Sequence, residues 1–131
     1  MIDDRELLER AQAVRKQAHA PYSDYRVGAA IVDDNGNVHV GCNVENSSYP
    51  EGNCAETSAI AAMVAAAGRR IVTIAVVADP VGTKACTPCG GCRQRINEFA
   101  DTDTRIILFD VNGEIVEYGI SDLLPASFSL R

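Results

Sequence analysis

Two short segments decide how this chain is organised: Asn53-Cys54-Ala55-Glu56, and Thr87-Pro88-Cys89-Gly90-Gly91-Cys92. Cys89 and Cys92 are three residues apart, so they share one face if a helix begins there, and a capping residue and a proline precede them. Cys54 and Glu56 are two residues apart. They converge on one site only in the first turn of a helix, with the site beyond the helix end. Two helix N-termini directed at one point favour thiolate over thiol. We therefore expect one zinc ion per chain, held by Cys54, Cys89 and Cys92.

Three protein ligands leave one position of a tetrahedral zinc open, which is typical of a catalytic zinc rather than a structural one. Glu56 is then expected to be the catalytic proton carrier and not a ligand. Two other interpretations of these residues exist. Asn53 and Glu56 have the spacing of a capping box, in which the carboxylate only caps a helix. Cys86 could join the three thiols in a four-cysteine zinc or iron–sulfur module without enzymatic activity.

C-x-E followed by P-C-x-x-C is the pattern of zinc deaminases in a three-cysteine form. With further matches in the same order, the chain resembles the small zinc-dependent deaminases that act on free cytidine and deoxycytidine. The resemblance runs from about Pro21 to the C-terminus. The matching segments are Pro21-Tyr22-Ser23, Val27-Gly28-Ala29-Ala30, Gly41-Cys42-Asn43-Val44-Glu45-Asn46, Ser48-Tyr49-Pro50, Cys54-Ala55-Glu56, Pro88-Cys89-Gly90-Gly91-Cys92-Arg93-Gln94 and Leu123-Leu124-Pro125.

The resemblance implies an enzyme that hydrolyses cytidine and 2′-deoxycytidine to uridine and 2′-deoxyuridine in pyrimidine salvage. Zinc would make hydroxide available at neutral pH for attack on C4 of the base. Glu56 would carry the proton to N3 and then to the departing amine, so that no second base is needed. The resemblance also implies a cytidine deaminase-like fold and a homotetramer whose active sites neighbouring subunits complete. The alternative within the fold is a deaminase of another aminated nucleoside, either blasticidin-like or a modified cytosine.

Six residues are expected to bind the substrate. Asn43 and Glu45 lie two apart on a strand, hence on one face and roughly 6–7 Å apart. In similar enzymes the matching pair binds the ribose. The resemblance also points to Tyr25, where the family usually has Phe, to Tyr49 at the rim, to Ala55 and to Phe128. An aromatic residue matching Phe128 stacks on the base across a subunit boundary in similar enzymes; simple packing of Tyr49 and a loose tail at Phe128 are the alternatives.

One departure from the family concerns the charge of the zinc site. Many members have Arg directly after the catalytic Glu, where it donates hydrogen bonds to the ligand sulfurs, and this chain has Thr57. Three thiolates with Zn²⁺ leave one net negative charge, which a nearby cation offsets. Arg93, next to a ligand, is retained. We expect it to carry this role alone.

Composition limits the partners and cellular locations that the sequence allows. A net charge of −6 argues against a nucleic acid partner, because a polynucleotide requires clustered Lys and Arg. No stretch has the length of a membrane span, and the charged start Met1–Glu6 does not resemble a secretory signal. Five cysteines, four of them in a spacing typical of metal sites, fit a reducing cytoplasm better than a disulfide framework.

Periodicity predicts an α/β fold in one domain, residues 1–131: a three-layer α/β/α sandwich around a mixed sheet of about five strands. A first amphipathic helix should end near Pro21. An Ala-rich second helix should run from Cys54 to Ala67 and stop at Gly68, and a third should begin at the second cysteine segment. Strands are expected at about 25–31, 38–44, 71–78, 105–109 and 114–118, with a hairpin turn at 34–36 and a short helix at 121–124.

Overall fold

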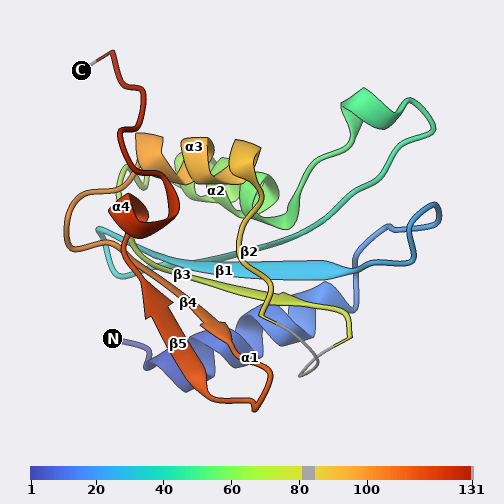
Figure 1. Ribbon diagram of the computed structural model, residues 1–131, viewed down its shortest axis with the longest axis horizontal. Helices are drawn as coiled ribbons and strands as arrows, with labels where there is room; N and C mark the ends of the chain where they lie inside the picture. Colours follow the sequence, from blue (N-terminus) through green and yellow to red (C-terminus); the bar gives the residue numbers. More distant parts are fainter. Residues whose placement is uncertain (81–84, 131) are drawn as a thin grey trace.

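The computed structural model describes residues 1–80 and 85–130, and its centre is a five-stranded sheet (Figure 1). The strands run in the spatial order β2-β1-β3-β4-β5, in which β3 and β4 are parallel and the other neighbours antiparallel. This confirms the predicted mixed sheet. The strands are β1 (Val27–Asp33), β2 (Val38–Cys42), β3 (Ile71–Ala78), β4 (Arg105–Phe109) and β5 (Ile115–Tyr118).

Helices cover both faces of this sheet, as predicted. One face carries α1 (Asp4–Arg15), whose Leu and Ala side chains pack into a core with β1, β3 and β4. The other face carries α2 (Ala55–Ala65) and α3 (Gly90–Glu98), which share a second core with β1, β3 and the short α4 (Ile120–Leu123). Figure 1 shows α1 below the strands, and α2 and α3 above them. Among the described residues, no helix combines the length and the apolar character needed to cross a bilayer.

The first helix is shorter than predicted, because the chain after it joins the sheet edge. α1 ends at Arg15 rather than near Pro21. The backbone of His19 then pairs with the segment beyond β2: its N–H donates to the Asn43 carbonyl at 3.0 Å, and its carbonyl accepts the Glu45 N–H at 2.8 Å. These two bonds require an extended backbone at His19. Tertiary pairing therefore overrides the helical periodicity in this segment.

The Ala-rich helix ends two residues early, and Gly68 has a different role from the one expected. The left-handed residue at the helix end is Ala67, with φ of 70°. Gly68 is needed for space, since a Cβ there would lie 2.6 Å from both the Asp33 carboxylate and the Met63 side chain. The N–H of Gly68 still closes the helix by donating to the Met63 carbonyl at 2.9 Å.

Two glycines let the helices lie directly on the sheet. A Cβ on Gly41 of β2 would meet the Ala59 amide nitrogen of α2 at 2.3 Å. On the opposite face, a Cβ on Gly28 of β1 would meet the Ala11 carbonyl oxygen of α1 at 2.0 Å. Since glycine has no side chain, the backbone of each helix can pack directly against the strand at these two positions. For α2 this contact fixes the helix whose first turn carries Glu56.

The chain between β2 and α2 turns back on itself and places polar residues beside the start of α2. β2 ends at Cys42, two residues before the predicted end. Val44 and Asn53 then form an isolated antiparallel bridge, with both N–H···O bonds at 2.9 Å. The short 3₁₀-helix η1 (Tyr49–Glu51) lies inside this loop. As a result, Asn43 and Glu45 lie next to the segment that leads into Cys54.

Candidate active site

The three predicted ligands come together at the starts of two helices. Cys54 is the N-cap residue of α2 and Cys89 is the N-cap residue of α3, and Cys92 lies in the first turn of α3. Their sulfur atoms all lie within 4.8 Å of one another, and the Cys54 and Cys89 sulfurs are 3.9 Å apart. A tetrahedral zinc with Zn–S bonds of about 2.3 Å needs sulfur atoms about 3.8 Å apart. The triad therefore fits a zinc ion. No large rearrangement is needed.

As thiols, Cys54 and Cys92 interact with each other. The pKa of Cys54 is lowered to about 6, mainly because its sulfur accepts a hydrogen bond from Cys92. The pKa of Cys92 is raised for the same reason, since that thiol donates to Cys54 and is also buried. These opposite directions describe one thiolate stabilised by its neighbours. A divalent cation bound among them is what would allow all three to ionise together.

Cys86 does not join the triad. Within the described residues, the group that could hold a metal ion contains Cys54, Cys89 and Cys92. The sulfur of Cys86 instead accepts a hydrogen bond from the Tyr25 hydroxyl, at 3.4 Å. This arrangement favours the three-ligand zinc site over the four-cysteine module.

Glu56 lies in the first turn of α2, two residues after a ligand, and only 4% of it is exposed. Burial raises its pKa to about 7, and the charge of Cys54 adds to the rise. The capping box with Asn53 is not formed: the N-cap position belongs to Cys54, and no side chain caps the helix start. A buried carboxyl group with a pKa near neutrality, beside the thiol triad, can both accept and donate a proton.

A cavity of about 460 Å³ opens beside the triad, and most of the predicted substrate residues line it. Glu56, Cys54 and Cys89 also line it. Cys86 and Thr87 are also in its wall, and Cys86 is a lining residue that the sequence did not assign to substrate. The predicted residues in the lining are Tyr25, Asn43, Glu45, Tyr49 and Ala55.

Tyr25 contributes a hydroxyl group to this cavity. Burial and the hydrogen bond to Cys86 raise its pKa to about 12, so the group stays protonated at neutral pH. Since its proton is donated to sulfur, the lone pairs of the hydroxyl oxygen remain available as acceptors. The hydroxyl proton therefore has a hydrogen-bond acceptor even when no substrate is bound.

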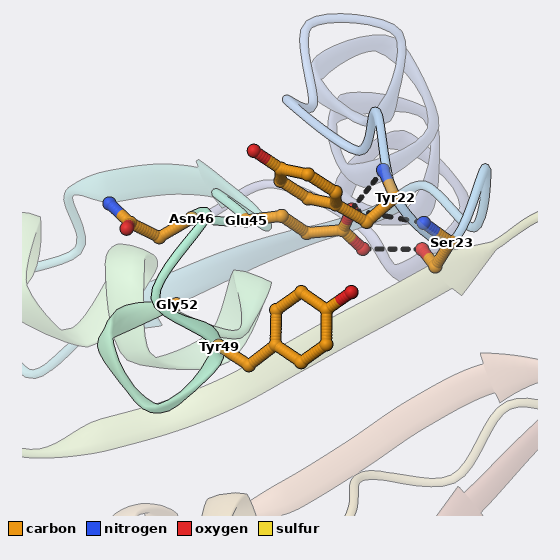
Figure 2. A pocket seen from close by; sticks show the side chains of 6 residues that line it. All are labelled: Tyr22, Ser23, Glu45, Asn46, Tyr49 and Gly52. Atoms are coloured by element: carbon orange, nitrogen blue, oxygen red, sulfur yellow. Dashed lines mark hydrogen bonds between the residues drawn. The ribbon is translucent and has the colours of Figure 1, made fainter.

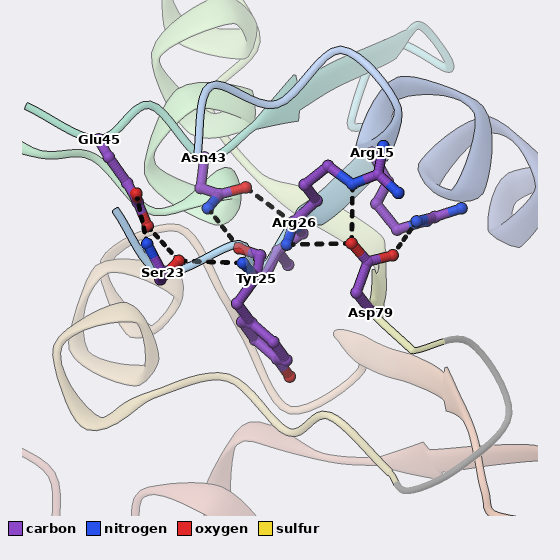
Figure 3. Close-up of polar contacts among 8 residues, drawn as sticks. Arg15, Ser23, Tyr25, Arg26, Asn43, Glu45 and Asp79 are labelled. Atoms are coloured by element: carbon purple, nitrogen blue, oxygen red, sulfur yellow. Dashed lines mark hydrogen bonds and ion pairs between the residues drawn. The ribbon is translucent and has the colours of Figure 1, made fainter. Parts of the chain in front are cut away.

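Asn43 has already committed part of its amide group to the backbone that precedes β1 (Figure 3). Its Oδ1 accepts the Val27 N–H at 2.8 Å, and its Nδ2 donates to the Tyr25 carbonyl at 2.9 Å. One N–H of the amide remains for a ligand. The same segment is anchored on its other side by Asp79, which pairs with Arg15 and, at 2.8 Å, with Arg26.

Glu45 is held by the loop that the Pro21-Tyr22-Ser23 motif forms. Its Oε1 accepts the N–H groups of Tyr22 and Ser23, at 2.9 and 3.1 Å, and its Oε2 accepts the Ser23 hydroxyl. This carboxylate, drawn in Figure 2, lines a second hollow of about 350 Å³. The two hollows share Ser23, Glu45, Tyr49 and Gly52. The pKa of Glu45 is lowered, mainly by the hydrogen bond from the Ser23 hydroxyl. A carboxylate has further lone pairs, so this fixed group can still accept from a sugar hydroxyl.

The two remaining aromatic residues are exposed. The Tyr49 ring lies at the rim, 76% exposed, and meets the Tyr22 ring edge-on with centroids 5.8 Å apart. Phe128 is 67% exposed and is not among the described residues that line either hollow of its own chain. Its carbonyl accepts from Gln94 at 3.2 Å, which fixes the tail on α3 and leaves the ring in solvent.

Arg93 has other partners than the expected ligand sulfurs. Its Nε donates to the Pro88 carbonyl at 2.7 Å, Nη1 to the Leu123 carbonyl at 2.9 Å and Nη2 to the Thr87 hydroxyl at 3.2 Å. These bonds tie the loop before Cys89 to α3 and α4. Arg93 therefore holds the ligand loop in place, and its contact with the sulfurs stays a prediction.

Taken together, the geometry fits a class of protein, the α/β metalloenzymes: three thiols that can hold a zinc ion lie at the starts of two helices, with a buried carboxyl group beside them. The family described as "Cytidine and deoxycytidylate deaminase zinc-binding region" matches residues 1–109. A cytidine deaminase from Sporosarcina psychrophila is 40% identical over 128 residues, which cover 98% of this chain and 93% of that protein.

The fold agrees with this match. The crystal structure of cytidine deaminase from Burkholderia pseudomallei superposes with a TM-score of 0.88 at 40% identity, covering 97% of this chain and all of that one. A blasticidin-S deaminase from Bacillus cereus is more distant, at 27% identity over 130 residues. This chain belongs to the cytidine deaminase family.

Proposed function

We propose that this protein hydrolyses the amino group of cytidine and 2′-deoxycytidine, giving uridine or 2′-deoxyuridine and ammonia. The observation that carries the proposal is the thiol triad with Glu56 beside it, in the wall of a cavity large enough for a nucleoside. The relatives at 40% identity, named cytidine deaminases, support this substrate over a blasticidin-like one, whose named relative is only 27% identical.

Cys54, Cys89 and Cys92 would hold the zinc ion, which as a Lewis acid makes water a nucleophile at neutral pH. Glu56 takes a proton from the attacking water and delivers it to N3 of the cytosine ring as the C4–O bond forms. It then takes the second proton from the new C4 hydroxyl group and passes it to the exocyclic amine, which leaves as ammonia when the C4–N bond breaks and the C4 carbonyl forms. Its raised pKa near 7 suits a group that must be base and acid in turn.

Asn43 and Glu45 would hold the sugar. The loop 22–23 and the start of β1 pre-position both groups, so that little ordering is needed when a hydroxyl binds. Tyr25 would lie against the sugar and base, with Ala55 beside the carboxyl group and Tyr49 at the rim. A panel of cytidine, 2′-deoxycytidine and blasticidin S, followed by ultraviolet absorbance, tests the substrate. Turnover of blasticidin S with none of cytidine would overturn the proposal.

We also infer a homotetramer in which Phe128 of one subunit reaches a neighbouring active site. α2 exposes small residues and the C-terminal tail exposes an aromatic ring. These exposed apolar surfaces support an assembled state, because assembly would remove them from water. Light scattering on the purified protein should give four times the 14.0 kDa mass of the chain. The five cysteines, none of which forms a disulfide in the described part of the chain, fit a reducing cytoplasm, where we place the reaction in pyrimidine salvage.

A further inference from the structure

Arg95 folds back over the first turn of α3, at a position outside both cysteine motifs. It lies three residues after Cys92 and four after Gly91, on an exposed part of the helix. Long helical side chains lean toward the helix N-terminus. Gly91 leaves room for this: a Cβ built there would lie only 3.1 Å from Nη1 of Arg95. The guanidinium group therefore lies over the turn that supplies two of the three ligands.

The zinc site needs a cation at this place. Three thiolates with one Zn²⁺ carry a net charge of −1, and the carboxyl group of Glu56 can add a second negative charge when it ionises. Thr57 offers only a neutral hydroxyl group, hydrogen-bonded to the Cys92 sulfur at 4.0 Å. The three donors of Arg93 described above go to oxygen atoms. Two helix N-termini supply partial positive charges, and Arg95 supplies a whole one.

The charge of Arg95 lies close to two of the ligands. Cys89 is the N-cap residue of α3 and Cys92 lies in its first turn. Because Nη1 of Arg95 reaches Gly91, which stands between these two ligands in the sequence, the guanidinium charge lies within about one helical turn of both.

We propose that Arg95 is a positioning residue of the zinc site, whose positive charge balances the zinc–thiolate centre and strengthens zinc binding. This inference rests on the proposed zinc-dependent function. Because the side chain is exposed, solvent screens its charge, and the effect on zinc affinity should be modest. The charge, rather than any packing contact, is the property that matters.

The test is a competition for zinc between the purified holoenzyme and a chromophoric chelator of known affinity, at pH 7.5. Arg95→Gln removes the charge at similar length, Arg95→Lys keeps it, and Arg10→Gln removes an exposed arginine from α1 on the opposite face of the sheet. We expect zinc to bind about 3- to 10-fold more weakly to Arg95→Gln. Arg95→Lys and Arg10→Gln should stay within about twofold of the wild type.

Ionic strength gives the second readout. The deficit of Arg95→Gln should shrink between low salt and about 0.5 M salt, since mobile ions screen an exposed charge over a few ångströms. Equal zinc affinity in Arg95→Gln and Arg10→Gln would overturn the role of Arg95 alone. So would a deficit shared by Arg95→Lys, or one unchanged by salt. A wild-type protein that holds no zinc would overturn the proposed zinc site itself.

Discussion

At the scale of single residues, the site combines groups whose roles were readable from spacing with groups whose roles depend on the fold. The three ligands and Glu56 were predicted because two short motifs specify them. Cys86 and Arg95 were not, since their effect depends on what lies opposite them in space. Arg95 had one available signal, a cation three residues after a ligand on the same helical face. No spacing rule connects Tyr25 with Cys86, which are 61 positions apart.

The hydroxyl group of Tyr25 gives the first prediction. In Tyr25→Phe, the hydrogen bond to Cys86 is lost and the ring is kept, so the free energy of unfolding should fall by about 1 kcal/mol or less. The KM for cytidine should change more than kcat, because the hydroxyl lies in the cavity wall and not at the zinc ligands. Thermal unfolding and steady-state kinetics measure the two effects. A loss in kcat alone would place the hydroxyl in the chemical step instead.

Asp33 gives the second prediction, which concerns pH. This carboxylate is fully buried; burial alone would raise its pKa, but hydrogen bonds from His39 and from the N–H groups of Asn37 and Asn35 outweigh it and lower the pKa. A lowered folded-state pKa means that the stabilisation is complete above the unfolded value of about 4. It is lost as the pH falls through the folded value.

The measurement is the free energy of unfolding by urea as a function of pH. The wild type should lose stability below about pH 4, and Asp33→Asn should lose less on acidification because the buried carboxylate is gone. At pH 7 the same variant should be about 1–3 kcal/mol less stable than the exposed control Asp103→Asn. Identical acid profiles for Asp33→Asn and the wild type would contradict this assignment.

At the scale of elements, periodicity predicted which helices and strands exist, but it did not predict where each of them begins and ends. β4 covers the predicted residues, Arg105–Phe109. The end of α1 could not be predicted, since it depends on the pairing of His19 with the segment after β2, which is remote in sequence. α3 starts at Gly90 with Cys89 as its cap residue, whereas the sequence predicted Thr87 as the cap. The Thr87 hydroxyl instead accepts a hydrogen bond from Arg93. Local propensity cannot reveal these tertiary contacts.

The close contact between β2 and α2 gives a prediction at this scale. Gly41→Ala places a methyl group against the backbone of α2 and should destabilise the fold by about 1–3 kcal/mol. It should also weaken zinc retention, because α2 carries Cys54 at its start. Gly28→Ala is the matched control: it displaces α1, on the face without ligands, so it should destabilise the protein without a specific loss of zinc.

Zinc content after dialysis against a weak chelator distinguishes the two variants at equal folded fraction, as judged by circular dichroism. If both glycine variants lose zinc equally, the contact between β2 and α2 has no particular role in the site. If neither loses stability, the helices can shift away from the sheet more easily than the distances indicate.

At the scale of the whole molecule, one sheet serves two cores, and we infer that residues 1–131 form one domain for that reason. The α2 and α3 layer carries the ligands, and the α1 layer supports the sheet from behind (Figure 1). The sequence predicted this architecture well, because an Ala-rich helix between two strands and a third helix after a buried strand leave few other arrangements. The assembly could not be predicted in this way, because periodicity along one chain does not specify contacts between subunits.

Phe128 gives the prediction that belongs to the assembly. If its ring stacks on the base in a neighbouring subunit, Phe128→Ala should raise the KM for cytidine about 3- to 10-fold, the value of a lost aromatic contact. Zinc content should not change. The control Leu130→Ala, a residue of the same tail that is 91% exposed, should leave KM as it is. An unchanged KM in Phe128→Ala would make this residue part of a loose tail.

The most direct test measures bound zinc and cytidine turnover together in the wild type and in Glu56→Gln, with the exposed Glu114→Gln as control. We predict one zinc per chain in all three proteins. Turnover should fall by at least about 100-fold in Glu56→Gln only, since the amide cannot carry the proton. Wild-type turnover in Glu56→Gln, or a chain that deaminates cytidine without binding zinc, would contradict a proton-carrying carboxyl group beside a three-thiolate zinc.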